Sequence, residues 1–151
     1  MKKSLALLLF FTALSLPAQT AAELDALLDT QAVSAAQAAR FLLAAADLLP
    51  AGLSGEAAET AAYDVARSNG WLKGTSADTI TLREAAFLAM GAFELKGGLM
   101  YSLFRNPRYA YREMAYRRLI QDGADPAMTV SGPMLLHFIG RLLDYSGEGE
   151  R

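Results

Sequence analysis

A run of arginines and tyrosines in the second half of the chain carries the side chains best suited to binding. Five arginines fall between residues 105 and 118 and are interleaved with tyrosines. Arginine binds carboxylate and phosphate bidentately, and tyrosine rings stack on sugars or on guanidinium groups. The segment therefore predicts a site for an anionic partner: a polysaccharide, a lipid headgroup or an acidic protein face. The candidate residues are Arg105, Arg108, Tyr109, Arg112 and Tyr116.

Two other interpretations of this segment are open. Arg108 and Arg112 are four residues apart, and Glu113 and Arg117 have the acid-first spacing of a helical ion pair. The segment is therefore also consistent with a solvated helix face above half-buried tyrosines. Basic residues interleaved with aromatic ones also occur in proteins that bind single-stranded nucleic acid. The formal net charge of −2 argues against that partner, and we expect no nucleic acid.

The sequence contains no recognisable catalytic or metal-binding motif. It has no cysteine and a single histidine, His137, which excludes thiolate metal sites, cysteine nucleophiles and an all-histidine site within one chain. Neither a phosphate-binding glycine loop nor a Gly-x-Ser-x-Gly elbow is present. We therefore predict a protein that is not an enzyme and uses no metal or cofactor. A small hydrolase would need His137 beside a carboxylate and a hydroxyl.

The N-terminus has the three parts of a secretory signal peptide. Two lysines precede an apolar run from Leu5 to Leu16, and small residues follow Pro17, which we expect to break any helix. The run is shorter than the roughly 20 residues that cross a bilayer as a helix. We predict that residues 1–22 are a signal peptide cleaved near Ala22, with an uncleaved anchor as the alternative. The remainder would be exported to the periplasm or the outer envelope surface, without an integral membrane span.

The rest of the chain is predicted to be all-α. Apolar residues recur with helical spacing, and strand signals are nearly absent. Glycine and proline mark where helices stop, and Asn106-Pro107 is a favoured helix start. We expect one compact domain over residues 23–145 and a frayed tail over 146–151. The expected helices cover residues 31–49, 56–68, 81–96, 106–121 and 131–143, with one or two amphipathic turns at 23–28 and a short apolar segment at 99–104.

Three helix starts share one pattern of residues. Val33-Ser34, Ile80-Thr81 and Val130-Ser131 each place a β-branched residue and a hydroxyl residue before an apolar helix, and they lie 47 and 50 residues apart. Gln37 and Glu84 follow the first two hydroxyl residues by three positions, which completes a capping box. We interpret the pattern as two and a half to three helix-loop-helix repeats with at most very short strands. One repeat cannot bury its own apolar face, so neighbouring repeats must stack.

The second copy of this pattern resembles the S-layer homology repeat. Gly70-Trp71-Leu72-Lys73-Gly74 ends one helix, and Ile80-Thr81-Leu82-Arg83-Glu84 opens the next. Residues 118–143 are a weaker match, and residues 33–46 match only the second half of a repeat. In that family three repeats form a pseudo-threefold domain whose grooves bind anionic cell-wall polysaccharide. The resemblance implies the same scaffold, and a second copy of the chain, in a homo-oligomer, is one candidate source of the missing half-repeat.

The arginine of the family's Ile-Thr-Arg-Ala-Glu motif is displaced in this chain. Leu82 stands at its position, and Arg83 follows one place later and joins the candidate site. We expect Trp71, the only tryptophan, to fill the core between repeats. The predicted function is a non-catalytic, exported module of the bacterial cell envelope that binds cell-wall polysaccharide or an envelope protein. The alternative is a periplasmic structural or chaperone-like protein that binds a protein client through an apolar groove around residues 99–104.

Overall fold

The computed structural model of the protein describes residues 15–121 and 123–148, and within them the regular structure is entirely α-helical. This confirms the predicted fold class. Two isolated β-bridges stand in place of strands in the same residues. The helices are α2 (Ser15–Leu28), α3 (Ala35–Ala45), α4 (Gly55–Ser68), α5 (Leu82–Ala92), α6 (Leu99–Leu103), α7 (Pro107–Tyr116) and α8 (Gly132–Glu148).

Helix α2 differs from the sequence expectation at Pro17. Pro17, expected to break a helix, lies within α2. The helix continues past Ala22, the expected cleavage point. The first part of the expected signal peptide, residues 1–14, lies outside the described residues. No helix within the described ranges is long and apolar enough to cross a membrane.

The other helices lie where predicted, but three of them end early. Helix α4 ends at Asn69-Gly70 as expected, with Gly70 at φ 72°. Helices α3, α5 and α7 instead end before non-glycine residues in the left-handed region: Asp47, Glu94 and Arg118, with φ of 58°, 50° and 59°. Their sequences offered no glycine at these points, so the expected ends were too late. Helix α8 extends to Glu148, into the segment expected to be a frayed tail.

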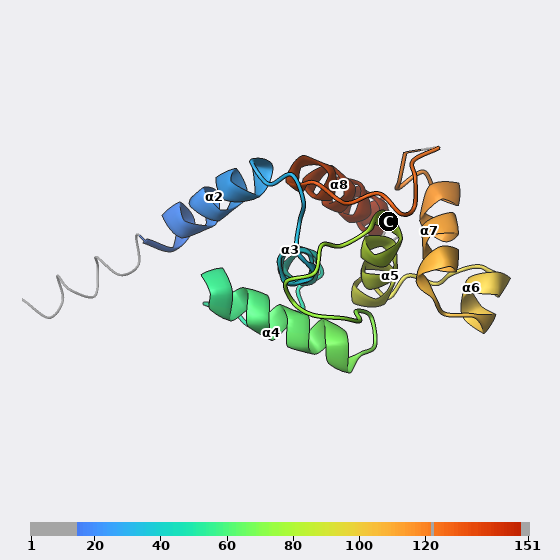
Figure 1. Ribbon diagram of the computed structural model, residues 1–151, viewed down its shortest axis with the longest axis horizontal. Helices are drawn as coiled ribbons and strands as arrows, with labels where there is room; N and C mark the ends of the chain where they lie inside the picture. Colours follow the sequence, from blue (N-terminus) through green and yellow to red (C-terminus); the bar gives the residue numbers. More distant parts are fainter. Residues whose placement is uncertain (1–14, 122, 149–151) are drawn as a thin grey trace, which may run out of the picture.

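Six of the helices pair into three arms (Figure 1). Helix α3 packs on α4, α5 on α7, and α8 on α2, while α6 packs on α7. Helices α3, α5 and α8 each follow one of the three Val/Ile-Ser/Thr dipeptides and lie around the middle of the molecule. The second helix of each arm belongs to the neighbouring helix-loop-helix unit. Each unit therefore buries its apolar face against the next, and the last unit closes on the first.

Three backbone hydrogen bonds form a closed ring where the arms meet. The Val33 amide donates to the Val130 carbonyl at 2.9 Å, the Val130 amide to the Ile80 carbonyl at 3.1 Å, and the Ile80 amide to the Val33 carbonyl at 3.0 Å. All three side chains are buried. The ring, which we call the hub, pairs buried amides and carbonyls without a sheet. The three dipeptides of the repeat therefore occupy equivalent positions.

The first amides of the three central helices are paired in an equivalent way. Those of Ala35, Leu82 and Gly132 each donate to a carbonyl in the segment that leads to a neighbouring dipeptide, at 2.8 to 2.9 Å. Amides in a first helical turn have no partner in their own helix, so the adjoining segment supplies one. The second amides of α3 and α5 are paired likewise, whereas α8 has Pro133 at that position and needs no partner.

Side-chain caps complete these helix starts. Ser34 Oγ accepts from the Gln37 amide, and Gln37 Oε1 accepts from the Ser34 amide, both at 3.1 Å, which confirms the first capping box. Before α5, the Glu84 carboxylate accepts from the Thr81 amide at 2.8 Å. Before α8, Ser131 Oγ accepts a longer bond, 3.4 Å, from the first turn. Local side chains therefore cap all three central helices, and the neighbouring segments position them.

Helix α2 closes the third arm by packing on α8, and it also contacts the first arm. Leu27 is buried, and its carbonyl oxygen lies so close to Gly132 that a β-carbon there would come within 1.6 Å of it. The Glu23 carboxylate accepts from the Arg40 guanidinium in α3 and, at 2.7 Å, from the Gly55 amide at the start of α4. Within one chain, α2 therefore supplies the half-repeat that the sequence analysis left unassigned.

Candidate functional site

The exposed face of α7 carries three of the predicted site residues. Arg108, Arg112 and Tyr116 recur every four residues, and all three side chains are exposed, Tyr116 by 86%. Ala110 and Met114 form the buried face of the same helix. The row of exposed side chains fits both the binding interpretation and the solvated-face interpretation.

The tyrosines between these residues are half-buried and join α7 to its neighbours. The Tyr109 ring, a predicted site residue, stacks on Phe104, with the ring centroids 5.9 Å apart. The Tyr111 hydroxyl donates to the Ala124 carbonyl in the connection that leads to α8. Tyr109 therefore fixes the end of α6, and its ring is only partly available to a ligand.

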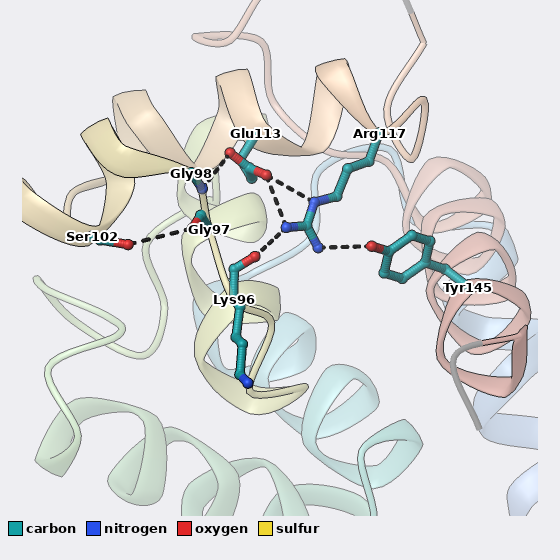
Figure 2. Close-up of polar contacts among 7 residues, drawn as sticks. All are labelled: Lys96, Gly97, Gly98, Ser102, Glu113, Arg117 and Tyr145. Carbon is teal, nitrogen blue, oxygen red and sulfur yellow. Dashed lines mark hydrogen bonds and ion pairs between the residues drawn. The ribbon is translucent and has the colours of Figure 1, made fainter.

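An ion pair on α7 fixes the base of α6 (Figure 2). Glu113 accepts from Arg117 Nε at 2.9 Å, which is the predicted pair, and its other oxygen accepts from the Gly98 amide at 2.9 Å. Arg117 also donates to the Lys96 carbonyl and, at 3.1 Å, to the Tyr145 hydroxyl of α8. We call this network the latch. It joins α7, α8 and the segment before α6, so Arg117 has a structural role.

A groove of about 840 Å³ lies between the turn after α4, helix α5 and helix α6. Trp71 from the turn, Phe87 from α5 and Tyr101 from α6 line it with aromatic rings. The polar side chains along it are Asn69, Glu94, Lys96, Ser102 and Arg105. Arg105, a predicted site residue, therefore lies in a concave surface beside aromatic rings that the sequence analysis did not assign to a site.

Two close contacts build the aromatic wall of the groove. The Trp71 indole lies on Gly91, where a β-carbon would be 2.4 Å from the ring. Phe87 and Tyr101 meet edge to face, with centroids 6.4 Å apart. Trp71 is half-buried, so it both packs on the core and lines the groove, rather than filling the core alone.

The groove combines neutral donors with positive charge. Burial raises the pKa of the Tyr101 hydroxyl, while the positive charge of Arg105 lowers it by a smaller amount. The hydroxyl therefore stays protonated at neutral pH and can donate a hydrogen bond. Among the residues that line the groove, Lys96 and Arg105 carry positive charges and Glu94 carries a carboxylate. Aromatic rings with hydroxyl and guanidinium donors suit a sugar that carries a carboxylate or a phosphate.

Arg83 does not line the groove. It is exposed in the first turn of α5, and its amide donates to the Pro126 carbonyl at 3.0 Å. A separate cavity of about 420 Å³, bounded by α5, α8 and the connection between α7 and α8, contains His137 and Asp125. Its other described lining residues are mostly apolar and include no serine, threonine or tyrosine. They therefore provide no hydroxyl nucleophile beside His137.

Comparison of the chain with protein-family models, with curated proteins and with solved structures returned no match. The resemblance to the S-layer homology repeat therefore rests on sequence motifs alone. In the described part of the chain, no group of three or more His, Cys, Asp or Glu side chains is arranged to hold a metal ion. The candidate site is accordingly defined by geometry: the groove with Arg105, and the exposed row on α7.

Proposed function

We propose that the protein is an exported, non-catalytic interaction module of the bacterial cell envelope, and that the groove between α4, α5 and α6 binds an anionic cell-wall polymer. The observation that carries this proposal is the joining of three aromatic rings with Lys96 and Arg105 in one groove. Aromatic rings stack on the apolar faces of sugars, and basic side chains pair with the acidic groups of the polymer.

The repeat scaffold supports the same proposal. Three equivalent dipeptides meet at the hub, as the S-layer homology resemblance implies. The groove begins at Gly70-Trp71, part of the segment on which that resemblance rests. Because the motif arginine of the family is displaced to Arg83, outside the groove, Arg105 of the α6–α7 connection takes the anion-binding role in this proposal.

Co-sedimentation with purified, lipid-free sacculi tests the groove. We expect the protein to sediment with them, and binding to weaken as salt screens the charges. The variant Lys96→Ala/Arg105→Ala should lose about tenfold or more in affinity, since it removes two charge-assisted hydrogen-bond donors. The matched variant Arg108→Ala/Arg112→Ala removes two exposed charges outside the groove and should bind like the wild type.

Three results would count against the groove. Absence of sedimentation at low salt would remove the wall polymer as the ligand. Equal binding by the wild type and both variants would exclude a role for these charges. Loss of binding in Arg108→Ala/Arg112→Ala alone would move the site to the exposed row on α7.

A further inference from the structure

The outer face of α6 exposes four large apolar side chains, which we call the tip. Leu99, Met100, Leu103 and Phe104 are exposed by 74%, 54%, 64% and 55%. They belong to one short helix and its C-cap, at the outer end of the arm formed by α5 and α7 (Figure 1). Tyr101 of the same helix is buried and anchors it. The tip is therefore apolar surface that the fold itself does not bury.

The sequence around the tip is basic. Residues 95–112 contain four basic residues and neither aspartate nor glutamate, in a chain with a formal net charge of −2. The basic residues are Lys96, Arg105, Arg108 and Arg112, and all are exposed. Of the two carboxylates that flank the segment, Glu94 and Glu113, the second is engaged in the latch. The segment that carries the tip is thus basic, although the whole chain is acidic.

The latch holds the tip in position. Gly98, the N-cap residue of α6, donates its amide to Glu113 at 2.9 Å. At the other end of α6, the Phe104 ring stacks on Tyr109 of α7. Because both ends of α6 are fixed, little conformational entropy remains to be lost when the exposed side chains bind a surface.

We propose that the tip docks on an anionic phospholipid surface. The four apolar side chains would insert among the headgroups, and the surrounding basic side chains would pair with the lipid phosphates. Apolar insertion combined with electrostatic attraction is how proteins bind membrane surfaces without crossing them. This surface is separate from the groove, although Arg105 borders both.

The shape of the tip favours a lipid surface over a protein client. The hollow between α6 and α7 is only about 250 Å³, and of the tip it takes in Leu99 and Met100 alone. Leu103 and Phe104 are exposed outside that hollow. A client segment held in an apolar groove needs concave walls, whereas a bilayer surface accepts projecting side chains.

Vesicle flotation tests the charge requirement. We expect the protein to float with phosphatidylglycerol/phosphatidylcholine vesicles and not with phosphatidylcholine alone. Binding should weaken with salt. The variant Arg105→Gln/Arg108→Gln/Arg112→Gln should lose about fivefold in partitioning for each arginine removed. Equal flotation with both lipid compositions, or with the triple variant, would overturn the proposal.

A matched pair of variants tests the apolar requirement. Leu103→Ser/Phe104→Ser should reduce partitioning about tenfold or more because it removes two inserted side chains. Leu48→Ser/Leu53→Ser changes two leucines that are 42% and 40% exposed between α3 and α4, and should bind like the wild type. Both variants contain the same N-terminal segment, so any membrane binding by that segment does not change the comparison between them. Unchanged binding by Leu103→Ser/Phe104→Ser would overturn the proposal.

A fluorescent probe reports insertion directly. The variant Phe104→Trp in a Trp71→Phe background has its only tryptophan at the tip, because the chain has a single natural one. Its emission should shift to shorter wavelength on anionic vesicles. Emission that stays unchanged while the protein floats would overturn insertion of the tip.

The readouts separate the lipid proposal from the other functions. If the protein suppresses aggregation of a denatured client and does not float with vesicles, the lipid proposal fails in favour of a client. If vesicle binding is absent and sacculus binding persists, only the lipid proposal fails. If vesicle binding persists and sacculus binding is absent, the lipid proposal stands and only the proposed role of the groove fails.

Discussion

At two positions of this protein, a group that lies against the backbone leaves room only for glycine. Gly132 accommodates the Leu27 carbonyl at the start of α8, and Gly91 accommodates the Trp71 indole in the last turn of α5. Glycine is unfavourable inside a helix unless a close contact requires it. The need for glycine at these positions could not be predicted from the sequence, because both contacts join residues far apart in the chain. By contrast, the Ser34 cap was predictable, since its partner Gln37 lies three residues away.

Replacing Gly132 by alanine tests the first of these contacts. The new methyl group would meet the Leu27 carbonyl oxygen at 1.6 Å, so we expect a loss of about 2–3 kcal/mol in the free energy of unfolding. Gly140 is the control in the same helix, since a methyl group there would meet nothing within 4 Å beyond its own helix backbone. Gly140→Ala should stabilise by about 0.5–1 kcal/mol. Urea denaturation measures both, and equal effects would contradict the close contact.

Ser34→Ala tests the cap. Ser34 Oγ accepts from the Gln37 amide, so its removal should cost about 1 kcal/mol. Ser54 holds the N-cap position of α4 but makes no side-chain cap hydrogen bond. Ser54→Ala should therefore leave the unfolding midpoint nearly unchanged. A Ser34→Ala protein as stable as Ser54→Ala would show that the box contributes nothing.

Elements formed where local patterns predicted them, but their ends and their assembly depended on distant contacts. Arg118 stops α7 in a left-handed conformation, and its carbonyl accepts from the Arg141 guanidinium of α8 at 2.8 Å. The groove likewise joins Trp71, Phe87 and Tyr101 from three elements. Clustering along the sequence identified the arginines. That clustering could not predict which aromatic rings meet, because the rings come together only after the arms pack.

The junction of α2 with α3 and α4 should make stability depend on pH. Burial raises the pKa of Glu23, but hydrogen bonds from Arg40 and from the Gly55 amide lower it, and the result lies below the ordinary value of 4.5. The ionised carboxylate therefore stabilises the fold above that value, and the contribution is lost as pH falls through the folded-state pKa. The pKa of nearby Glu59 is shifted in the opposite direction, because burial raises it.

Thermal unfolding of two variants across pH tests this assignment. Glu23→Gln should be less stable than the wild type at neutral pH, and the difference should vanish in acid, where the wild-type carboxylate is protonated. Glu59→Gln should instead gain stability at neutral pH, because it removes a carboxylate whose charged form is disfavoured in the folded state. Parallel pH profiles for Glu23→Gln and the wild type would contradict a role for the Glu23 charge.

At the scale of the whole molecule, the three arms depend on one another through the hub. Each hub residue donates to one unit and accepts from the other, so removing any unit leaves a buried amide and a buried carbonyl unpaired. The repeat of the dipeptides in the sequence predicted two and a half to three units. It did not predict that α2 closes the third arm, because the contacts of Glu23 and Leu27 join residues far apart in the chain.

A truncated chain that ends at Met128 tests this dependence. It lacks Val130 and all of α8, and we expect it to lose cooperative thermal unfolding by circular dichroism rather than to retain two folded arms. A chain that ends at Glu148 is the control and should melt like the full protein. If the shorter chain keeps a sharp transition, the first two arms fold independently of the hub.

The hub also constrains the order in which the helices can pack while the chain is synthesised from its N-terminus. The arms α3–α4 and α5–α7 join helices close in sequence and can form early. Helix α2 packs on α8, and Val33 needs the Val130 carbonyl, so both must wait for the end of the chain. The packing of α2, the first described helix to be synthesised, against α8 is thus among the last contacts to form. Until then, Leu27 lacks the packing against the start of α8 that it has in the folded protein.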